Sequence, residues 1–212
     1  MAELDLHEQE QVDALKAWWK DNGKYVMGVL IVGLLAFAAM QFWKKHQSSQ
    51  ADDAAKLYVE VVKQATSNDA KRVGDAADAL VSRFAGSAYA PRAQLLASQV
   101  SLQAKDVSRA KTQLLWVTEH ANEVALQDAA RLKLASVLLD EKKFEEALKQ
   151  LDAAHPESFT GLYADLKGDV LSAMGKNAEA RTAYQLALNK TDEKSMYRNL
   201  IQLKLDGLGA AK

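Results

Sequence analysis

The strongest feature of the hydropathy pattern is an apolar run from Tyr25 to Trp43, in which none of the nineteen positions is charged. At a rise of about 1.5 Å per residue, a helix of this length spans close to the roughly 30 Å hydrocarbon core of a bilayer. Aromatic residues, which favour the headgroup level, bound the run, and lysines lie just outside it. These bounding residues are Trp18, Trp19, Lys24, Phe42, Lys44 and Lys45. The pattern predicts one transmembrane helix over residues 24–45, with the lipid bilayer as a partner.

Two other structures compete for this run. A buried helix of a soluble protein would show a polar stripe, and this run shows none. A cleaved signal peptide fits the small residues Ala36 and Ala38, but the apolar run continues to Trp43 and the preceding segment is acidic. Lysines are nearly balanced on the two sides, so the positive-inside rule leaves the orientation of the span open.

The segment before the span has its own helical pattern. Val12, Leu15 and Trp19 recur at helical spacing, and Asp21–Gly23 is typical of a helix end. We therefore predict a short amphipathic helix within a tail of residues 1–23. Such a helix either lies on the membrane surface, which these residues favour, or docks onto another membrane subunit.

The remainder of the chain is predicted to be helical. From about residue 48 onward the apolar positions recur with a helical period, and no segment alternates with a period of two. This pattern predicts an all-α domain over residues 46–212, with no sheet. Pro91 and Pro156 are predicted to lie between helices, where a proline interrupts no helical hydrogen bond.

Two segments of this domain, 132–154 and 166–188, resemble one another, with their matching alanines Ala147 and Ala180 33 residues apart. A helix–turn–helix unit of about 34 residues is typical of tetratricopeptide repeats, in which small residues let two antiparallel helices approach closely. The alternative is a pair of unrelated amphipathic hairpins, but the matched small positions favour the repeat. These small residues are Ala135 and Ala147 in the first segment, and Gly168 and Ala180 in the second.

Turns and further helix pairs extend the repeat in both directions. Gly175 marks the turn of the second repeat, and Lys142–Lys143 occupies the matching turn of the first. A weaker copy is predicted at 92–117, another helix pair at 51–84 with its break at Ser67-Asn68-Asp69, and a final capping helix at 197–205. The predicted fold is a single N-terminal transmembrane helix followed by a tetratricopeptide-like α-solenoid of antiparallel helix pairs.

Composition excludes several classes of function. The 212 residues carry 27 Lys and Arg against 28 Asp and Glu, which excludes a nucleic-acid-binding protein with a broad cationic face. The chain has no cysteine, so thiolate nucleophiles and Cys-based zinc sites are excluded. No two of the four histidines share a metal-binding spacing, and no phosphate-binding loop or nucleophile elbow occurs. We therefore expect no cofactor, no bound metal and no enzymatic activity.

Two stretches resemble a known family. Residues 10–47 resemble the N-terminus of the bacterial YfgM family, in which an acidic tail, a D/E-Q-V-E/D-A-hydrophobic-K segment and an N-G-K lead into the membrane span. A later stretch resembles the family's Y-A-D-L-R/K-G-D/E motif, and together the two make the resemblance cover nearly the whole chain. The matching residues are Gln11–Lys16, Asn22–Lys24 and Tyr163–Asp169, with Gly175 and Ala180-Arg181 after the last motif.

The resemblance implies an inner-membrane protein of Gram-negative bacteria, with its tail in the cytoplasm and its tetratricopeptide domain in the periplasm. YfgM-like proteins are ancillary subunits of the SecYEG translocon and associate with the membrane-anchored chaperone PpiD. The implied role is to pass unfolded secretory proteins from the translocon to periplasmic chaperones. The resemblance implies no catalytic residues and assigns no binding residues.

On a tetratricopeptide frame, the first helix of each pair lines a concave groove, which predicts a candidate partner-binding surface. Its leucines fit equally well as core residues, and its two acids, at i and i+4, are expected on a solvated helix face. Two other functions stay open: a regulatory adaptor whose cytoplasmic tail sequesters a soluble signalling protein, and a tetratricopeptide scaffold that faces the cytosol. The candidate groove residues are Leu132, Ser136, Leu139, Leu162, Asp165 and Asp169.

Overall fold

The computed structural model describes residues 2–67 and 69–209, without the side chains of residues 2–7. Asn68 of the predicted break, Met1 of the predicted tail and residues 210–212 of the predicted domain lie outside the described residues. The chain divides into two compact units, Met1–Ala51 and Asp52–Lys212. The second unit is called the helical domain below.

The N-terminal helix α1 (Ala2–Ala65) is continuous, so the predicted helix end at Asp21–Gly23 is wrong. A glycine that ends a helix usually takes a positive φ, but among the described residues only Gly175 and Gly209 are glycines with that geometry. The Asn22 side chain also bonds within the helix, because its Nδ2 donates to the carbonyl of Trp18 at 3.0 Å. A helical glycine costs only about 1 kcal/mol, which the long apolar helix tolerates here.

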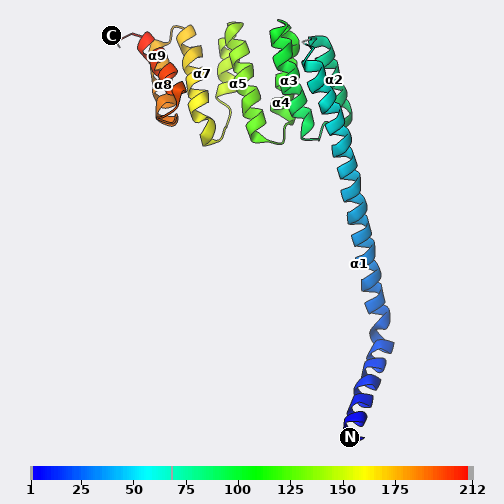
Figure 1. The fold of residues 1–212 in the computed structure, drawn as a ribbon. Helices are drawn as coiled ribbons and strands as arrows, with labels where there is room; N and C mark the ends of the chain where they lie inside the picture. Colours follow the sequence, from blue (N-terminus) through cyan, green and yellow to red (C-terminus); the bar gives the residue numbers. More distant parts are fainter. Residues whose placement is uncertain (1, 68, 210–212) are drawn as a thin grey trace. The chain divides into compact units, whose positions relative to one another are not determined.

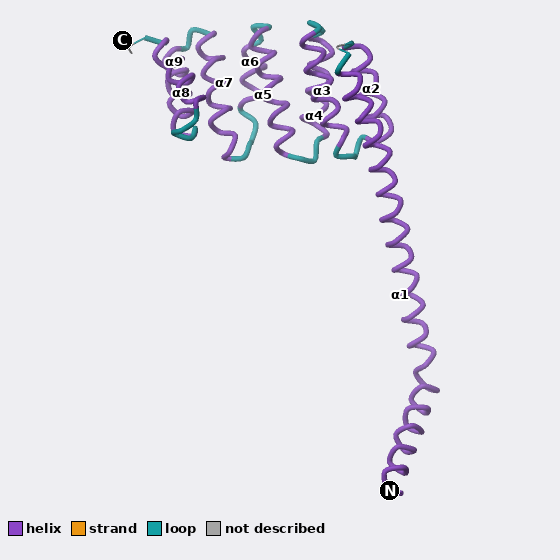
Figure 2. Tube along the Cα trace, in the orientation of Figure 1, coloured by secondary structure: helices purple, strands orange, loops and turns teal. Residues whose placement is uncertain are grey.

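The helical domain begins with the last part of α1, and the chain then continues as a series of antiparallel helices joined by short loops (Figures 1 and 2). No strand occurs among the described residues, so the predicted all-α fold is confirmed, as are the break before residue 70 and the final helix. The remaining elements are α2 (Ala70–Phe84), α3 (Tyr89–Gln103), α4 (Val107–His120), α5 (Val124–Asp140), α6 (Phe144–Leu151), the 3-10 helix η1 (Glu157–Phe159), α7 (Thr160–Ala173), α8 (Asn177–Lys190) and α9 (Met196–Gly207).

The same turn geometry joins the two helices of three successive pairs. Lys105, Lys142 and Gly175 each have a positive φ, of 63°, 60° and 76°. In each turn the amide of the following residue donates to a carbonyl five residues earlier, as from Lys176 to Leu171. This is the Schellman arrangement, which satisfies the last carbonyls of a helix. The turn predicted at Lys142–Lys143 is confirmed, as is the one at Gly175.

Small residues bring the helices of each pair together. Ala135, Ala147 and Ala180 are fully buried. At Gly168 an added Cβ would overlap the ring of Tyr184 on the partner helix, so the close approach of α7 and α8 requires glycine. Three contiguous apolar clusters fill the space between successive pairs, and buried area of this kind supplies most of the favourable free energy of folding.

One of the two proline predictions is wrong. Pro156 lies between α6 and η1 as expected, but Pro91 is the third residue of α3 and is buried. The first turn of a helix has amides with no intrahelical acceptor, so a proline there forfeits no hydrogen bond. The pattern of apolar residues could not show that α3 begins before this proline rather than after it.

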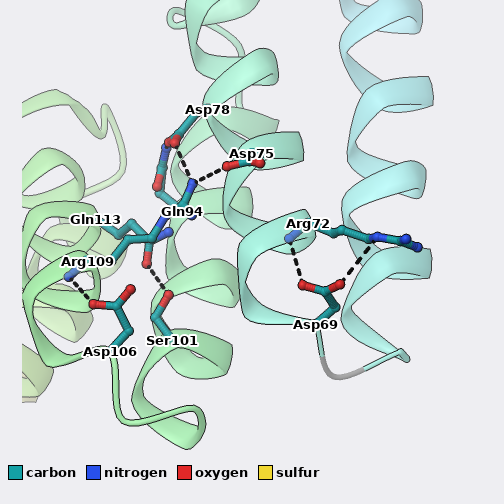
Figure 3. Close-up of polar contacts among 9 residues, drawn as sticks. All are labelled: Asp69, Arg72, Asp75, Asp78, Gln94, Ser101, Asp106, Arg109 and Gln113. Atoms are coloured by element: carbon teal, nitrogen blue, oxygen red, sulfur yellow. Dashed lines mark hydrogen bonds and ion pairs between the residues drawn. The ribbon is translucent and has the colours of Figure 1, made fainter.

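Polar side chains tie α2, α3 and α4 together (Figure 3). Arg109 of α4 donates to Asp75 at 2.7 Å and to Asp78 at 3.0 Å, and Gln94 of α3 donates to Asp78 at 3.0 Å. The hydrogen bond to Asp75 raises the pKa of Arg109; burial opposes this effect, and the hydrogen bond to Asp78 adds to it. The two aspartates are more than half exposed, so these ion pairs orient the helices and add little stability.

Candidate membrane anchor and protein-interaction surfaces

No residue of the apolar run of α1 is buried, and all but Val26 are exposed. Its most apolar 18-residue window has a mean hydropathy of 2.1, and none of that window is buried. Leu34 is 68% exposed and Phe42 is 76% exposed. Among the described residues, α1 is the one helix whose length and composition allow it to cross a membrane. Exposure of this much apolar surface is costly in water and favourable in lipid.

The four apolar and hydroxyl candidates for the groove lie in different environments. Leu132 and Leu139 of α5 are half-buried and pack against the central core cluster. Ser136, between them on α5, is exposed, and Leu162 of α7 is 41% exposed. Of these four residues, only Ser136 and Leu162 are therefore exposed to solvent.

The two acidic candidates do not lie on a solvated face, and that prediction is wrong. Asp165 is 2% exposed. Its Oδ2 accepts from the hydroxyl of Tyr197 at 2.5 Å and from Lys204 Nζ at 2.8 Å, both on α9. Asp169 accepts from the same Lys204 at 2.7 Å and from Tyr184 at 2.7 Å. Both carboxylates thus attach α9 to α7 and α8.

These contacts shift the titration of their partners. Burial raises the pKa of Tyr184 and of Tyr197, and the hydrogen bonds to Asp169 and Asp165 raise them further. Burial lowers the pKa of Lys204, but its bonds to the two carboxylates outweigh that effect and raise it. Lys204 therefore stays charged and the two tyrosines stay neutral at neutral pH, which holds the cluster together.

A second buried carboxylate joins α5 to α7. Asp128 is fully buried, and its Oδ1 accepts from the Tyr163 hydroxyl at 2.8 Å and from Arg131 at 3.2 Å. The ring of His155 stacks on Tyr163, with 4.0 Å between the centroids. Asp128 of α5 accepts from a tyrosine near the start of α7, and Asp165 of α7 accepts in the same way from Tyr197 near the start of α9. The same contact therefore recurs along the solenoid.

One hollow of the surface lies over α5, between α4 and α6, with a volume of 370 Å³. Leu134 and Leu138 contribute to it from α5, while Leu115 of α4 is 44% exposed. The rest of the lining is polar or charged, so the hollow combines an apolar surface with polar groups, as protein-binding sites do. None of the six predicted groove residues lines it. Its remaining residues are Ser108, Lys111, Thr112, Glu146, Lys149 and Gln150.

Comparison with known proteins decides the family. A family model described as a tetratricopeptide repeat-like domain matches residues 16–210. A protein of Neisseria gonorrhoeae named ancillary SecYEG translocon subunit is 31% identical over 204 residues, which cover 96% of this chain and 98% of that protein. The chain belongs to the YfgM family.

Other members of the YfgM family are similar over the same length. Proteins of the same name from Haemophilus influenzae and Escherichia coli are 24% and 26% identical. The matches cover 96% and 97% of this chain and 98% of each relative, so they include both the apolar run and the helical domain. No solved structure gives a significant match to the chain.

Two surfaces of this YfgM-family chain escaped the sequence analysis. Leu115 directly follows the core residue Leu114, but the residues one helical turn from it are polar, which was a signal of an exposed position; they are Lys111, Thr112, Thr118 and Glu119. On α9, in contrast, apolar residues occupy both sides of the helix, with Met196, Leu200 and Leu203 exposed and Ile201 and Leu205 buried. The apolar residues at i, i+4 and i+7 beside a second buried row were a signal that could have been found.

Proposed function

We propose that this chain is a membrane-anchored, non-catalytic ancillary subunit of the SecYEG translocon. One observation carries the proposal: over nearly its whole length, apolar run included, the chain is similar to proteins that bear that name. The exposed apolar run of α1 supports the anchor, and a tetratricopeptide repeat-like domain supports protein binding rather than chemistry.

The proposed mechanism uses anchoring to compensate for weak contacts. The span holds the helical domain beside the translocon in the inner membrane, with the N-terminus in the cytoplasm and the domain in the periplasm. Fixing one end of the chain raises the effective concentration of its partners. A micromolar contact, worth about −8 kcal/mol, then suffices to hold an unfolded secretory protein and still permits its release to a PpiD-like chaperone.

We propose two contact surfaces for such partners on the helical domain. One is the first-helix surface of the repeats, where Ser136 and Leu162 are exposed. The other is the hollow beside Leu115, whose apolar surface and polar rim suit an apolar side chain of an extended segment. Leu132 and Leu139 support the first surface from within the core, and Asp165 and Asp169 secure α9.

The orientation is tested with single cysteines, because the chain has none of its own. Ser67→Cys, just after α1, and Glu8→Cys, before the span, are treated with a membrane-impermeant maleimide in cells with a permeable outer membrane. We expect labelling of Ser67→Cys alone, with both variants labelled after lysis. Labelling of Glu8→Cys alone would overturn the proposed mechanism in favour of a scaffold in the cytosol.

Association with the translocon is tested by replacing Leu34, exposed within the span, with a photo-crosslinking amino acid in native membranes. We expect covalent products with SecYEG subunits. The same amino acid at the exposed position Lys142, in a turn of the helical domain, is the matched control. The absence of SecYEG products from Leu34 would contradict a translocon contact through the span.

The two contact surfaces are separated by Leu162→Asp and Leu115→Asp. Both side chains are more than 40% exposed, so both variants are expected to keep the helical circular dichroism of the wild type. The variant that loses capture of an unfolded secretory protein identifies the surface. If neither variant weakens capture, neither surface is the binding site. Leu139→Asp, in contrast, is expected to unfold the domain, because Leu139 packs against the core.

A further inference from the structure

Gly23 is covered by an aromatic ring in a stretch of α1 that is otherwise open. Among residues 8–51, whose side chains are described, it is the one buried residue. The indole of Trp19, one helical turn earlier, lies over it: a Cβ built at Gly23 would be 3.2 Å from Nε1 and 3.3 Å from Cε2 of that ring. Gly28 and Gly33, further along the same helix, have nothing within 4 Å of such a Cβ. Gly23 is therefore the seat of the Trp19 ring.

The seat brings the Trp19 ring toward the apolar run. Long helical side chains normally lean back over the preceding turn, because each Cα–Cβ bond tilts toward the N-terminus of the helix. The ring of Trp19 instead lies over the following turn, at Gly23, which is two positions before the run begins at Tyr25. At about 1.5 Å per residue, the ring is about 3 Å outside the run, whereas the Cα of Trp19 is about 9 Å outside it.

The seat and the far end of the run are separated by the thickness of a bilayer core. Gly23 and Trp43 are 20 positions apart in the unbroken helix α1, which corresponds to about 30 Å, and the hydrocarbon core is also about 30 Å thick. Trp19 is 50% exposed and Trp43 is 71% exposed, so both rings are open to their surroundings. Since indole rings favour the headgroup level, the helix can hold one ring at each boundary.

The neighbours of Gly23 suit the same boundary. Asn22 stays helical, and its side chain donates to the carbonyl of Trp18 at 3.0 Å. Lys24 Nζ lies 5.0 Å from the centroid of the Tyr25 ring, a position from which the ammonium reaches headgroups while its stem stays apolar. The segment that the sequence pattern marks as a helix end is therefore a continuous helical turn between the tail and the span.

We propose that Trp19, seated on Gly23, fixes the depth of the span by binding the headgroup and ester layer of the leaflet on its N-terminal side. This inference rests on the proposed membrane anchor. The indole N–H of Trp19 has no acceptor among the described residues, and lipid ester carbonyls supply acceptors at this depth. Lipid is the occupant because the adjoining run is apolar on every side and unburied, as a lipid-facing helix is.

The first test asks whether the seat places the ring. The full chain, with its other three tryptophans replaced by phenylalanine, is reconstituted in vesicles of phosphatidylethanolamine and phosphatidylglycerol. Lipids brominated near the ester group are expected to quench Trp19 more than lipids brominated near the chain end. Gly23→Leu fills the seat and moves the ring outward by up to about one turn, roughly 5 Å, so we expect iodide in the water to quench it at least about two-fold more.

The matched control for the seat is Gly28→Leu. It adds the same side chain to the same helix, at a position where nothing lies within 4 Å of a Cβ, and is expected to leave iodide quenching of Trp19 unchanged. Equal quenching in Gly23→Leu and Gly28→Leu would overturn the proposal. Unchanged helical circular dichroism confirms that each variant is folded.

The second test separates a depth anchor from a local packing contact. Gln41→Cys, near the far end of the run, carries an environment-sensitive bimane label. We expect Trp19→Ala to shift the emission of this label, because the helix loses its hold on the boundary. Trp18→Ala is the matched control, since Trp18 is 51% exposed and has no glycine seat, and we expect it to cause no shift. Equal shifts in the two variants, or none in either, would also overturn the proposal.

Failure of the membrane anchor itself gives a different result. A chain that keeps Trp43 as its one tryptophan reports whether the span is inserted at all. If no brominated lipid quenches Trp43, the span lies outside the bilayer, and both the anchor and this inference are wrong. If brominated lipids quench Trp43 while Trp19 is as open to iodide as free tryptophan, the anchor stands and only the role of Trp19 is wrong.

Discussion

The ring of Tyr184 on α8 lies over the backbone of Gly168 on α7, in the space that a Cβ of residue 168 would fill. The ring is also held from its other end, because its hydroxyl donates to Asp169 at 2.7 Å. Tyr184 therefore cannot move aside without losing a hydrogen bond. This one contact sets how closely the last helix pair can pack.

Gly168→Ala is predicted to destabilise the helical domain by about 1–3 kcal/mol, since overpacking forces a side chain or helix to shift. The measurement is denaturant unfolding of the full chain in detergent, followed by circular dichroism. Gly86→Ala is the matched control, because nothing lies within 4 Å of a Cβ built there, and it is expected to change stability by less than about 0.5 kcal/mol. Equal stability of the two variants would contradict the close packing of α7 and α8.

Lys142→Gly is predicted to stabilise the domain. Lys142 has a φ of 60°, a conformation that costs an L-residue roughly 1–2 kcal/mol and costs glycine little. Part of that gain is offset by the greater freedom of glycine in the unfolded chain, so we expect a net gain of about 0.5–1 kcal/mol. The reciprocal change, Gly175→Ala, is expected to lose a similar amount. A loss of stability in Lys142→Gly would show that the lysine side chain contributes more than its backbone strain costs.

Tyr163→Phe is predicted to cost about 1–3 kcal/mol, because it leaves the buried carboxylate of Asp128 with Arg131 as its remaining donor. Phenylalanine keeps the ring packing, so the loss reports the hydrogen bond rather than a cavity. The control is Tyr58→Phe, since no hydrogen bond of the Tyr58 hydroxyl occurs among the described residues. Thermal unfolding that is unchanged in both variants would mean that water replaces the tyrosine at Asp128.

The helical domain is predicted to lose stability at alkaline pH. Burial, followed by hydrogen bonds to aspartates, raises the pKa of Tyr163, Tyr184 and Tyr197 above the ordinary value of about 10. The folded state therefore holds these protons more tightly than the unfolded state. This contribution is fully present below about pH 10 and is lost as the pH rises above it. Lys204, whose pKa is also raised, acts in the same direction.

The alkaline loss is measured as the melting temperature of the full chain between pH 8 and pH 12. Tyr197→Phe removes one of the ionising groups, so its melting temperature should fall less steeply above about pH 10 than that of the wild type. A melting temperature that stays level through this range in both proteins would contradict the burial of these hydroxyls.

Local features of the sequence alone determined the span, the all-α fold and the paired helices. Hydrophobic periodicity depends on residues three or four positions apart, and a span depends on the length of one apolar run, so Tyr25–Trp43 and the repeat around Ala147 and Ala180 were visible without a structure. The turn at Gly175 was equally local, because a single residue adopts its positive φ.

Tertiary structure alone decided which polar and apolar side chains are buried. Asp165 has the same helical spacing as a surface acid, and it is buried because Tyr197 and Lys204, more than thirty positions later, supply its hydrogen bonds. Leu115 of α4 and Leu200 of α9 carry a local signal of exposure, but only the packing of the described helices shows that no other helix covers them. Burial is set by contacts between distant residues, and no local pattern contains them.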